Sequence, residues 1–171
     1  MRRRSWPGSA AYALISQGPG LLSLGGDHFI SYPLIKAHVR KHGGPISILH
    51  FDAHSDTWAD ENNRIDHGTM FWWATKQGLV DPAHSVQIGL RTHNPDTLGF
   101  NIIDGPAIQS QSLEATIAST RKFLGDSPVY VTFDIDCLDP SVAPGTGTPV
   151  CAGLTTHQAM SILRGLQGIN I

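Results

Sequence analysis

The residues best suited to chemistry occur in one short run, His50-Phe51-Asp52-Ala53-His54-Ser55-Asp56, which directly follows the apolar residues 46–49. Side chains alternate with a period of two in an extended chain, so Asp52, His54 and Asp56 project to one side where this strand ends. Open α/β sheets bind their ligands at the carboxyl ends of the strands. The pattern therefore predicts three ligands that converge at one edge of a sheet.

Two further segments repeat this arrangement. Asp134 and Asp136 follow the apolar residues 129–133, and the run Gly25-Gly26-Asp27-His28 follows the apolar residues 21–24. The two glycines permit a tight turn that presents His28 at the same edge. The three strand ends together supply six candidate metal ligands: His28, Asp52, His54, Asp56, Asp134 and Asp136.

Four carboxylates gathered at one edge would repel one another unless cations neutralised them, so the six residues predict a metal centre. Oxygen and imidazole ligands without a thiolate suit Mn²⁺, with Co²⁺ or Ni²⁺ as alternatives, better than structural Zn²⁺. Six residues can hold two ions about 3.5–4 Å apart if some carboxylates bridge them, as in binuclear hydrolases. Such a centre remains negative with a bridging hydroxide and favours a cationic substrate.

Other polar residues have simpler interpretations. We expect Asp27 to cap the element that follows it and Asp139 to lie in a turn. His50 lies one step deeper in the strand than the ligands, and we expect it to be a hydrogen-bonded core histidine. The aromatic run Phe71-Trp72-Trp73 is typical of core packing. The remaining histidines lack acidic partners at ligand spacing and are expected at the surface: His38, His42, His84, His93 and His157.

These ligands need elements that bring them to one edge. Continuous apolar runs predict five parallel strands, at residues 21–24, 46–51, 85–90, 100–103 and 129–133. Helical spacing behind the N-cap Ser112 predicts a helix that ends at Gly125. Thr155 and Gln158 form a capping box, which predicts a second helix before Gly168. Strands that alternate with helices indicate an α/β fold built from βαβ units.

Composition excludes several classes of function. The 171 residues suffice for one compact domain, and 15% charged residues against an average of about 25% favours segments buried on both sides. A net charge of −2 provides no basic field for nucleic acid, and no run approaches the ~18 apolar residues of a membrane span. Cys137 and Cys151 are too few for a disulfide framework and lack C-x-x-C spacing. We expect both to be buried, and we expect a cytoplasmic protein.

The motifs GGDH, HFDAHSD, DHGTMF and TFDIDCLDP, followed by GTGTPV, occur in this order. In them the chain resembles the ureohydrolase family of arginases and agmatinases, from about Leu21 to the last residue. The DHGTMF segment is more similar to agmatinases than to arginases. The resemblance implies a three-layer α/β/α fold with a central parallel sheet and a site that holds two Mn²⁺ ions.

The resemblance also implies a role for each ligand. One ion would be held by His28, Asp52, Asp56 and Asp134, and the other by Asp52, His54, Asp134 and Asp136, so that Asp52 and Asp134 bridge. His67 would be the catalytic residue that carries protons to the leaving amine. The reaction implied is hydrolysis of a guanidinium, most simply of agmatine to putrescine and urea. Full-length members of the family commonly form homo-oligomers.

The residues alone predict only that the protein is a binuclear hydrolase that prefers cationic substrates. A guanidino acid such as guanidinobutyrate therefore stays an alternative substrate, and a non-catalytic metal-binding chain is an alternative of another class. The family's glutamate-containing segment, expected after a strand that begins at Ile169, does not occur in this sequence. We therefore expect residues 1–171 to form a partial ureohydrolase domain that is incomplete at both ends, with an atypical segment at 1–20 and limited activity.

Overall fold

A parallel sheet of four strands lies at the centre of the computed structural model, which describes residues 7–18, 20–59 and 62–171. The strands are β1 (Ser47–Phe51), β2 (Val86–Ile88), β3 (Asn101–Ile103) and β4 (Val129–Phe133). Their order is β3-β2-β1-β4, and every pair is parallel. All five residues of β1 are buried because the strand lies between two others and is covered on both faces.

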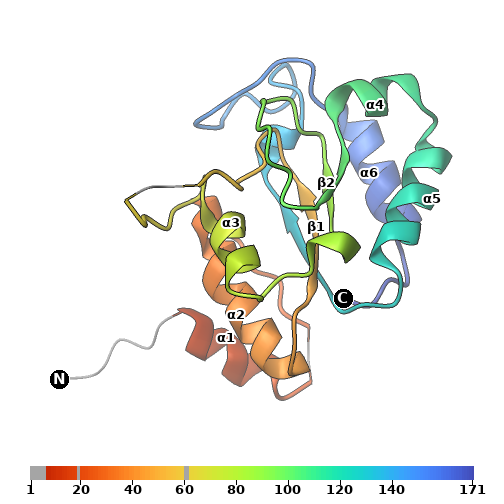
Figure 1. The fold of residues 1–171 in the computed structure, drawn as a ribbon. Helices are drawn as coiled ribbons and strands as arrows, with labels where there is room; N and C mark the ends of the chain where they lie inside the picture. The colour runs from red at the N-terminus through yellow and green to blue at the C-terminus, as the bar shows by residue number, and fades with distance from the viewer. Residues whose placement is uncertain (1–6, 19, 60–61) are drawn as a thin grey trace.

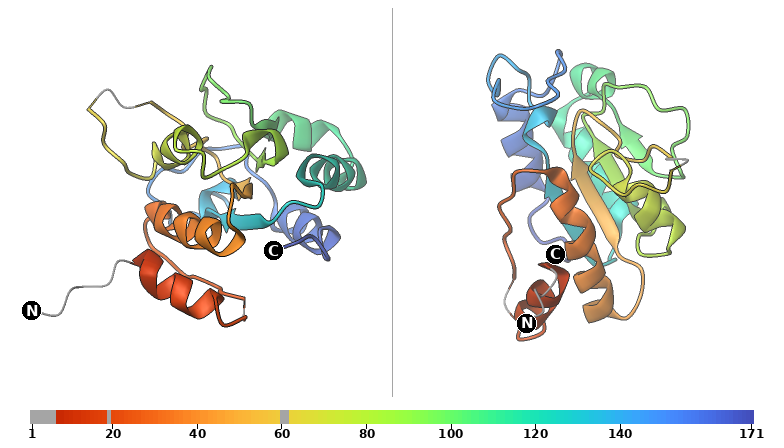
Figure 2. Two further views of the ribbon diagram at one scale, coloured as in Figure 1. Left: turned by 60° about the horizontal axis from the view of Figure 1, so that its bottom comes forward. Right: turned by 90° about the vertical axis from the view of Figure 1, so that its left-hand side faces the viewer.

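Helices cover both faces of this sheet and create three layers (Figure 1). The helices are α1 (Pro7–Ile15), α2 (Ser31–His42), α3 (Met70–Lys76), α4 (Gly105–Ser110), α5 (Leu113–Leu124) and α6 (Thr156–Gly165). Three 3-10 turns complete the described elements: η1 (His28–Ile30), η2 (Pro82–His84) and η3 (Ile135–Cys137). Helix α1 packs on α2, outside the layer next to the sheet (Figure 2). The predicted three-layer α/β/α class is confirmed.

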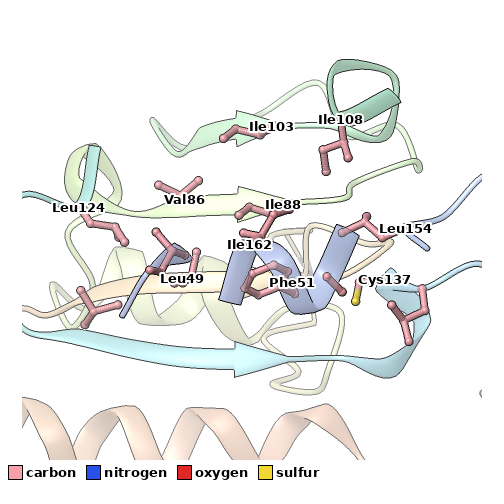
Figure 3. Packing of buried hydrophobic residues seen from close by; sticks show 14 of the residues in the cluster. Leu49, Phe51, Val86, Ile88, Ile103, Ile108, Leu124, Cys137, Leu154 and Ile162 are labelled. Carbon is pink, nitrogen blue, oxygen red and sulfur yellow. The ribbon is translucent and has the colours of Figure 1, made fainter. Parts of the chain in front are cut away.

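Alternate residues of β1 pack into different layers. Leu49 and Phe51 belong to a core cluster with residues of α4, α5 and α6, which Figure 3 shows from close by. Ile48 packs on the opposite face with residues of α2 and α3, among them the fully buried Phe71. The period of two that separates the layers also determines which side chains reach the end of the strand.

The predicted helix caps are confirmed. The Ser112 side chain accepts a hydrogen bond from the backbone at the start of α5, and Gly125 ends that helix with a φ of 56°. Thr155 and Gln158 form the reciprocal capping box at the start of α6. Helix α6 ends at Gly165, before the glycine at position 168.

The prediction of a strand at residues 21–24 is wrong. No strand of the described sheet pairs with this segment, and the side chains of Leu22 and Leu24 are 86% and 88% exposed. A strand needs a neighbouring strand for its hydrogen bonds, and three leucines in a run of four residues carry no information about that neighbour. Near the other end of the chain, the carbonyl of Asn170 accepts a hydrogen bond of 2.7 Å from the amide of Val129, but residues 169–171 are not a strand.

Three expectations about single residues also need correction or support. Cys137 is buried as predicted, but Cys151 is exposed because it lies in the loop before α6. His38 is half-buried rather than at the surface, since its ring packs 5.5 Å from that of Tyr130. His50 is fully buried, as expected of a core histidine. Within the described ranges, no helix combines the length and apolar character needed to cross a membrane.

Candidate metal centre

The candidate ligands gather at the carboxyl ends of the adjacent strands β1 and β4. Phe51 pairs with Phe133 in the parallel register, so Asp52 and Asp134 leave the sheet at the same level. The ladder continues one step further, because the Asp134 amide donates to the Phe51 carbonyl at 2.9 Å. The predicted convergence of these two strand ends is therefore a consequence of their pairing.

Local hydrogen bonds aim each carboxylate. Asp134 caps η3, and its Oδ1 accepts from the amide of Asp136 at 3.1 Å, which turns Asp136 back toward the sheet. The Ala53 amide then donates to Asp136 Oδ1 at 3.0 Å, so a backbone group of the β1 loop holds a carboxylate of the β4 loop. Asp56 has a left-handed backbone with a φ of 53°, which bends the chain after the ligand run.

His28 is the centre of a first ligand group, which comprises His28, Asp52, Asp56 and Asp134. Its Nδ1 lies 3.0 Å from Asp52 Oδ2, 3.0 Å from Asp56 Oδ2 and 3.3 Å from Asp134 Oδ2. Although buried, this Nδ1 has no well-oriented hydrogen bond. Asp27 caps η1 through the Phe29 amide, as predicted, and so presents His28 to the three carboxylates.

His54 is the centre of a second ligand group, which comprises His54, Asp52 and Asp136. Its Nδ1 lies 3.2 Å from Asp52 Oδ1 and 3.1 Å from Asp136 Oδ2. Asp52 thus takes part in both groups, with Oδ2 toward His28 and Oδ1 toward His54. One carboxylate with an oxygen in each group is the arrangement expected of a bridge between two ions.

The carboxylates shift the titration of both histidines. Burial lowers the pKa of His28, but the carboxylates of Asp52 and Asp56 outweigh it and raise this pKa to about 10. Asp136 and then Asp52 raise the pKa of His54 to about 10. Without metal, both imidazoles therefore carry a proton at neutral pH and act as cations among the carboxylates.

The carboxylates respond to burial in different ways. Burial raises the pKa of Asp56 and of Asp134 above the ordinary value. Burial acts in the same direction on Asp52, but the neighbouring imidazoles, that of His50 first, hold its pKa far below the ordinary range. The buried negative charge of Asp52 is thus stabilised by the protonated rings of His28 and His54 and by the contact with His50.

The donor set fits divalent ions. Ligand atoms of Asp52, His54 and Asp136 all lie within 4.8 Å of one another, as do those of His28, His50, Asp52 and Asp56. The buried Nδ1 of His28 lies 3.0–3.3 Å from three carboxylate oxygens without a well-oriented hydrogen bond, and a divalent ion between these atoms would satisfy all of them. The six predicted ligands are therefore brought together, as two groups that share one aspartate.

His50 lies behind this centre and is more closely involved than expected. Its Nε2 lies 2.8 Å from Asp52 Oδ2, and its Nδ1 lies 2.9 Å from the amide nitrogen of Gln87. The Gln87 amide also donates to the Ser55 carbonyl at 2.7 Å. Since a donor from Gln87 makes Nδ1 an acceptor, Nε2 carries the hydrogen that bonds Asp52. The sequence signal for this involvement of His50 was its position, which is in phase with the candidate ligands in the period of two.

His67 lies apart from both ligand groups. Its side chain is 62% exposed on the loop before α3, and its Nδ1 lies 3.1 Å from Asp27 Oδ2. This contact joins the loop of His67 to the turn that holds His28. His67 belongs to neither ligand group, and its role in proton transfer stays a prediction.

Residues 8–171 match the sequence pattern of the arginase family. The chain belongs to the arginase family. It is 54% identical to an agmatinase of Chromobacterium violaceum over 162 residues, which are 94% of this chain and 50% of that relative. The resemblance read from the motifs is therefore confirmed.

Solved structures agree with this assignment to the arginase family. A hypothetical agmatinase from Burkholderia thailandensis superposes with a TM-score of 0.93 at 50% identity and covers 96% of this chain and 52% of its own. The proclavaminate amidino hydrolase of Streptomyces clavuligerus superposes with a TM-score of 0.87 at 36% identity, over 93% of this chain and 55% of its own. This chain thus spans about half the length of the relatives it matches.

The sequence patterns did not reveal a cavity beside the candidate ligands of this arginase-family chain. The cavity has a volume of about 320 Å³, and Ser55, Thr57, Arg91 and Asn94 are among its lining residues. The Asn94 side chain donates to both Ser55 and Thr57 at 3.0 Å, on either side of the ligand Asp56. The Gly-Leu-Arg-Thr-His-Asn run after a buried strand was the only sequence signal for these residues.

Proposed function

We propose that this chain holds two Mn²⁺ ions and hydrolyses a guanidinium substrate, with agmatine as the leading candidate and putrescine and urea as products. The observation that carries the proposal is Asp52, whose two oxygens face two separate histidines, each with further carboxylates around it. This arrangement supports a binuclear centre, and oxygen-rich ligands without a thiolate favour Mn²⁺.

We assign the ligands as the family resemblance implies. The first ion would be held by His28, Asp52, Asp56 and Asp134, and the second by Asp52, His54, Asp134 and Asp136. The contacts of His28 and His54 with these carboxylates support the assigned group of five of the six residues. For Asp134, the contact with His28 supports binding to the first ion. A bridging role for Asp134 is part of the proposal.

The ions, when bound, would supply Lewis acidity and lower the pKa of water. The carboxylates of the chain would bind the substrate, because their negative charge attracts the guanidinium cation to the sheet edge. Asp56 is suited to accept hydrogen bonds from guanidinium N–H groups as the central carbon becomes tetrahedral.

Proton transfer falls to His67 in this proposal. Water adds to the guanidinium carbon, the bond from this carbon to the amine nitrogen breaks, and that nitrogen must gain a proton before the amine leaves. His67 is exposed and can exchange protons with solvent. The contact of its Nδ1 with Asp27 leaves Nε2 for the substrate.

The choice of substrate is based on similar proteins. Relatives named agmatinase that are 50–54% identical to this chain favour agmatine as its substrate. A guanidino acid such as guanidinobutyrate is the second candidate, because a relative of very similar fold is named for an amidino hydrolysis of proclavaminate. Cytoplasmic location and homo-oligomer formation stay expectations from cysteine content and from the family resemblance.

Metal content and urea release test the proposal together. The chain, stripped of metal with chelator and reloaded with Mn²⁺, is expected to bind two ions and to release urea from agmatine faster than from guanidinobutyrate. Asp52→Asn is the matched control that should lose both metal and urea release. If the chain binds two ions but releases urea from no guanidino compound, the alternative of a non-catalytic metal-binding chain is supported. Failure to bind two ions would contradict the proposed centre.

A further inference from the structure

Arg91, three residues beyond β2, has an unusual set of partners. Its Nη2 donates to the carbonyls of Asp136 and Val150 at 2.7 and 2.8 Å, and its Nη1 to those of Gly89 and Cys137 at 2.9 and 3.1 Å. Its Nε donates to the carbonyl of Cys151 at 3.1 Å. A guanidinium has five N–H donors, so each of them is occupied by a backbone carbonyl.

These bonds converge on a carboxylate of the second ligand group. The η3 turn that contains Asp136 has only three residues, so contacts outside the turn must determine its orientation. Arg91 bonds two successive carbonyls of that turn, those of Asp136 and Cys137. It joins the same turn to the loop at residues 150–151.

The backbone of Arg91 closes a circuit with the other ligand loop. The Arg91 amide donates to the Ala53 carbonyl at 2.9 Å, and Ala53 lies between the ligands Asp52 and His54. The Ala53 amide donates in turn to Asp136 Oδ1 at 3.0 Å. One residue thus fixes the separation of the β1 loop from Asp136, through its backbone on one side and its side chain on the other.

The stem of the Arg91 side chain passes close to the backbone at the start of α4. A Cβ added to Gly105, the first residue of α4, would lie 2.9 Å from Arg91 Cγ and 3.2 Å from Cδ. Glycine at this position therefore lets the stem of Arg91 pass. Although Arg91 lines the 320 Å³ cavity, its N–H groups are all engaged and leave none for a substrate carboxylate.

We propose that Arg91 is a positioning residue for the second metal ion, which it serves by orienting Asp136 relative to Asp52 and His54. The proposal rests on the binuclear centre proposed above. It predicts that changes at Arg91 weaken one ion and spare the other, because none of the five carbonyls bonded by the guanidinium belongs to a residue of the first ligand group.

Arg91→Lys tests this proposal with Arg121→Lys as the matched control. Arg121 also donates to backbone carbonyls, those of Gly165 and Gln167, but it joins α5 to the end of α6, and neither partner belongs to a turn that carries a candidate ligand. Both variants keep the positive charge and lose the planar fork of donors. Calorimetric titration with Mn²⁺ gives the two affinities, and electron paramagnetic resonance shows whether the two ions are coupled.

For Arg91→Lys we expect one affinity to fall about 10–100-fold, as is typical when the partner of a metal ligand is lost. The other affinity should stay within about twofold, and the signal of coupled ions should give way to that of a single ion, as in Asp136→Asn. Arg121→Lys should lower the unfolding temperature and leave both affinities unchanged. Gly105→Ala, which displaces the Arg91 stem without removing it, should reproduce the metal pattern of Arg91→Lys.

Equal weakening of both ions by Arg91→Lys, or no weakening, would overturn the proposal. If Arg91→Lys does not fold, Gly105→Ala decides in the same way, by selective or unselective loss. A wild-type chain that binds fewer than two ions would contradict the binuclear centre itself, and this result is obtained before any Arg91 variant is tested.

Discussion

Asp52 differs from the other candidate ligands because its two oxygens serve different groups. Asp52→Asn should therefore reduce occupancy by both Mn²⁺ ions, whereas Asp136→Asn should weaken mainly the ion near His54. Metal analysis and calorimetry on the two variants measure this difference. Loss of a single ion from each variant would show that Asp52 does not bridge.

His67 provides the contrasting case of a residue outside both ligand groups. His67→Ala should keep two bound ions and lower kcat for urea release by roughly 10²–10⁴-fold, the usual contribution of general acid–base catalysis. Paired measurements of metal content and turnover separate these effects. If metal and rate are lost together, His67 belongs among the ligands.

The raised pKa values of His28 and His54 make metal binding depend on pH. Both imidazoles carry a proton below about pH 10 in the metal-free chain, and a metal ion binds only the neutral ring. Binding of both ions near pH 7 should therefore release close to two protons, and apparent affinity should rise with pH up to about 10. Calorimetry in buffers of different ionisation enthalpy measures the released protons.

The opposite result would be informative about the same residues. A binding enthalpy that does not depend on the buffer would mean that no protons leave. The two histidines would then be neutral before metal binds, and the carboxylates around them would not have the influence inferred here.

At the scale of elements, the start of α6 depends on its capping box. Thr155→Ala removes the acceptor for the Gln158 amide and should lower the free energy of unfolding by about 0.5–2 kcal/mol. Denaturant titration measures the change. Thr156→Ala, at the next position, which is also exposed, is the control and should have a much smaller effect. Equal effects of the two substitutions would show that the Thr155 cap does not stabilise the helix.

Local signals explain which elements were predictable. Ser112 and Thr155 act on amides three residues away, so their sequence contains the whole interaction. The run at residues 21–24 led to a wrong strand prediction because a strand forms only with a partner strand, which lies elsewhere in the chain. The ligand run 52–56 was predictable because period two and the strand end are both local properties.

The remainder of the site depends on contacts between distant segments. The five acceptors of Arg91 come from three loops, and nothing near position 91 in the sequence indicates them. The pair of Asp27 and His67 likewise joins residues 40 positions apart. Sequence patterns could therefore predict the ligands but not the residues that hold them in place.

At the scale of the molecule, β4 is an edge strand of the described sheet: β1 is the one strand paired with it there, and the Val129 amide bonds the Asn170 carbonyl. Leu22 and Leu24 are exposed near this edge, and with β4 they line one cavity. Unpaired edges with exposed apolar side chains promote association. We expect the chain to associate as its concentration rises, as measured by sedimentation velocity.

Two leucine substitutions test the source of this association. The double variant Leu22→Lys, Leu24→Lys should shift the chain toward monomer. Val142→Lys, which changes another exposed apolar residue in the loop before α6, is the control and should have little effect. A chain that stays monomeric at every concentration, or a control as effective as the double variant, would contradict this role of the β4 edge.

The pairing of Phe51 with Phe133 has a consequence for folding. A slip of one residue between β1 and β4 would move Asp134 by about 3.3 Å along the strand and turn its side chain to the other face. The two halves of the ligand set would then no longer meet. Metal ions can therefore select the native register from its alternatives, and their binding free energy would be added to this one strand pairing.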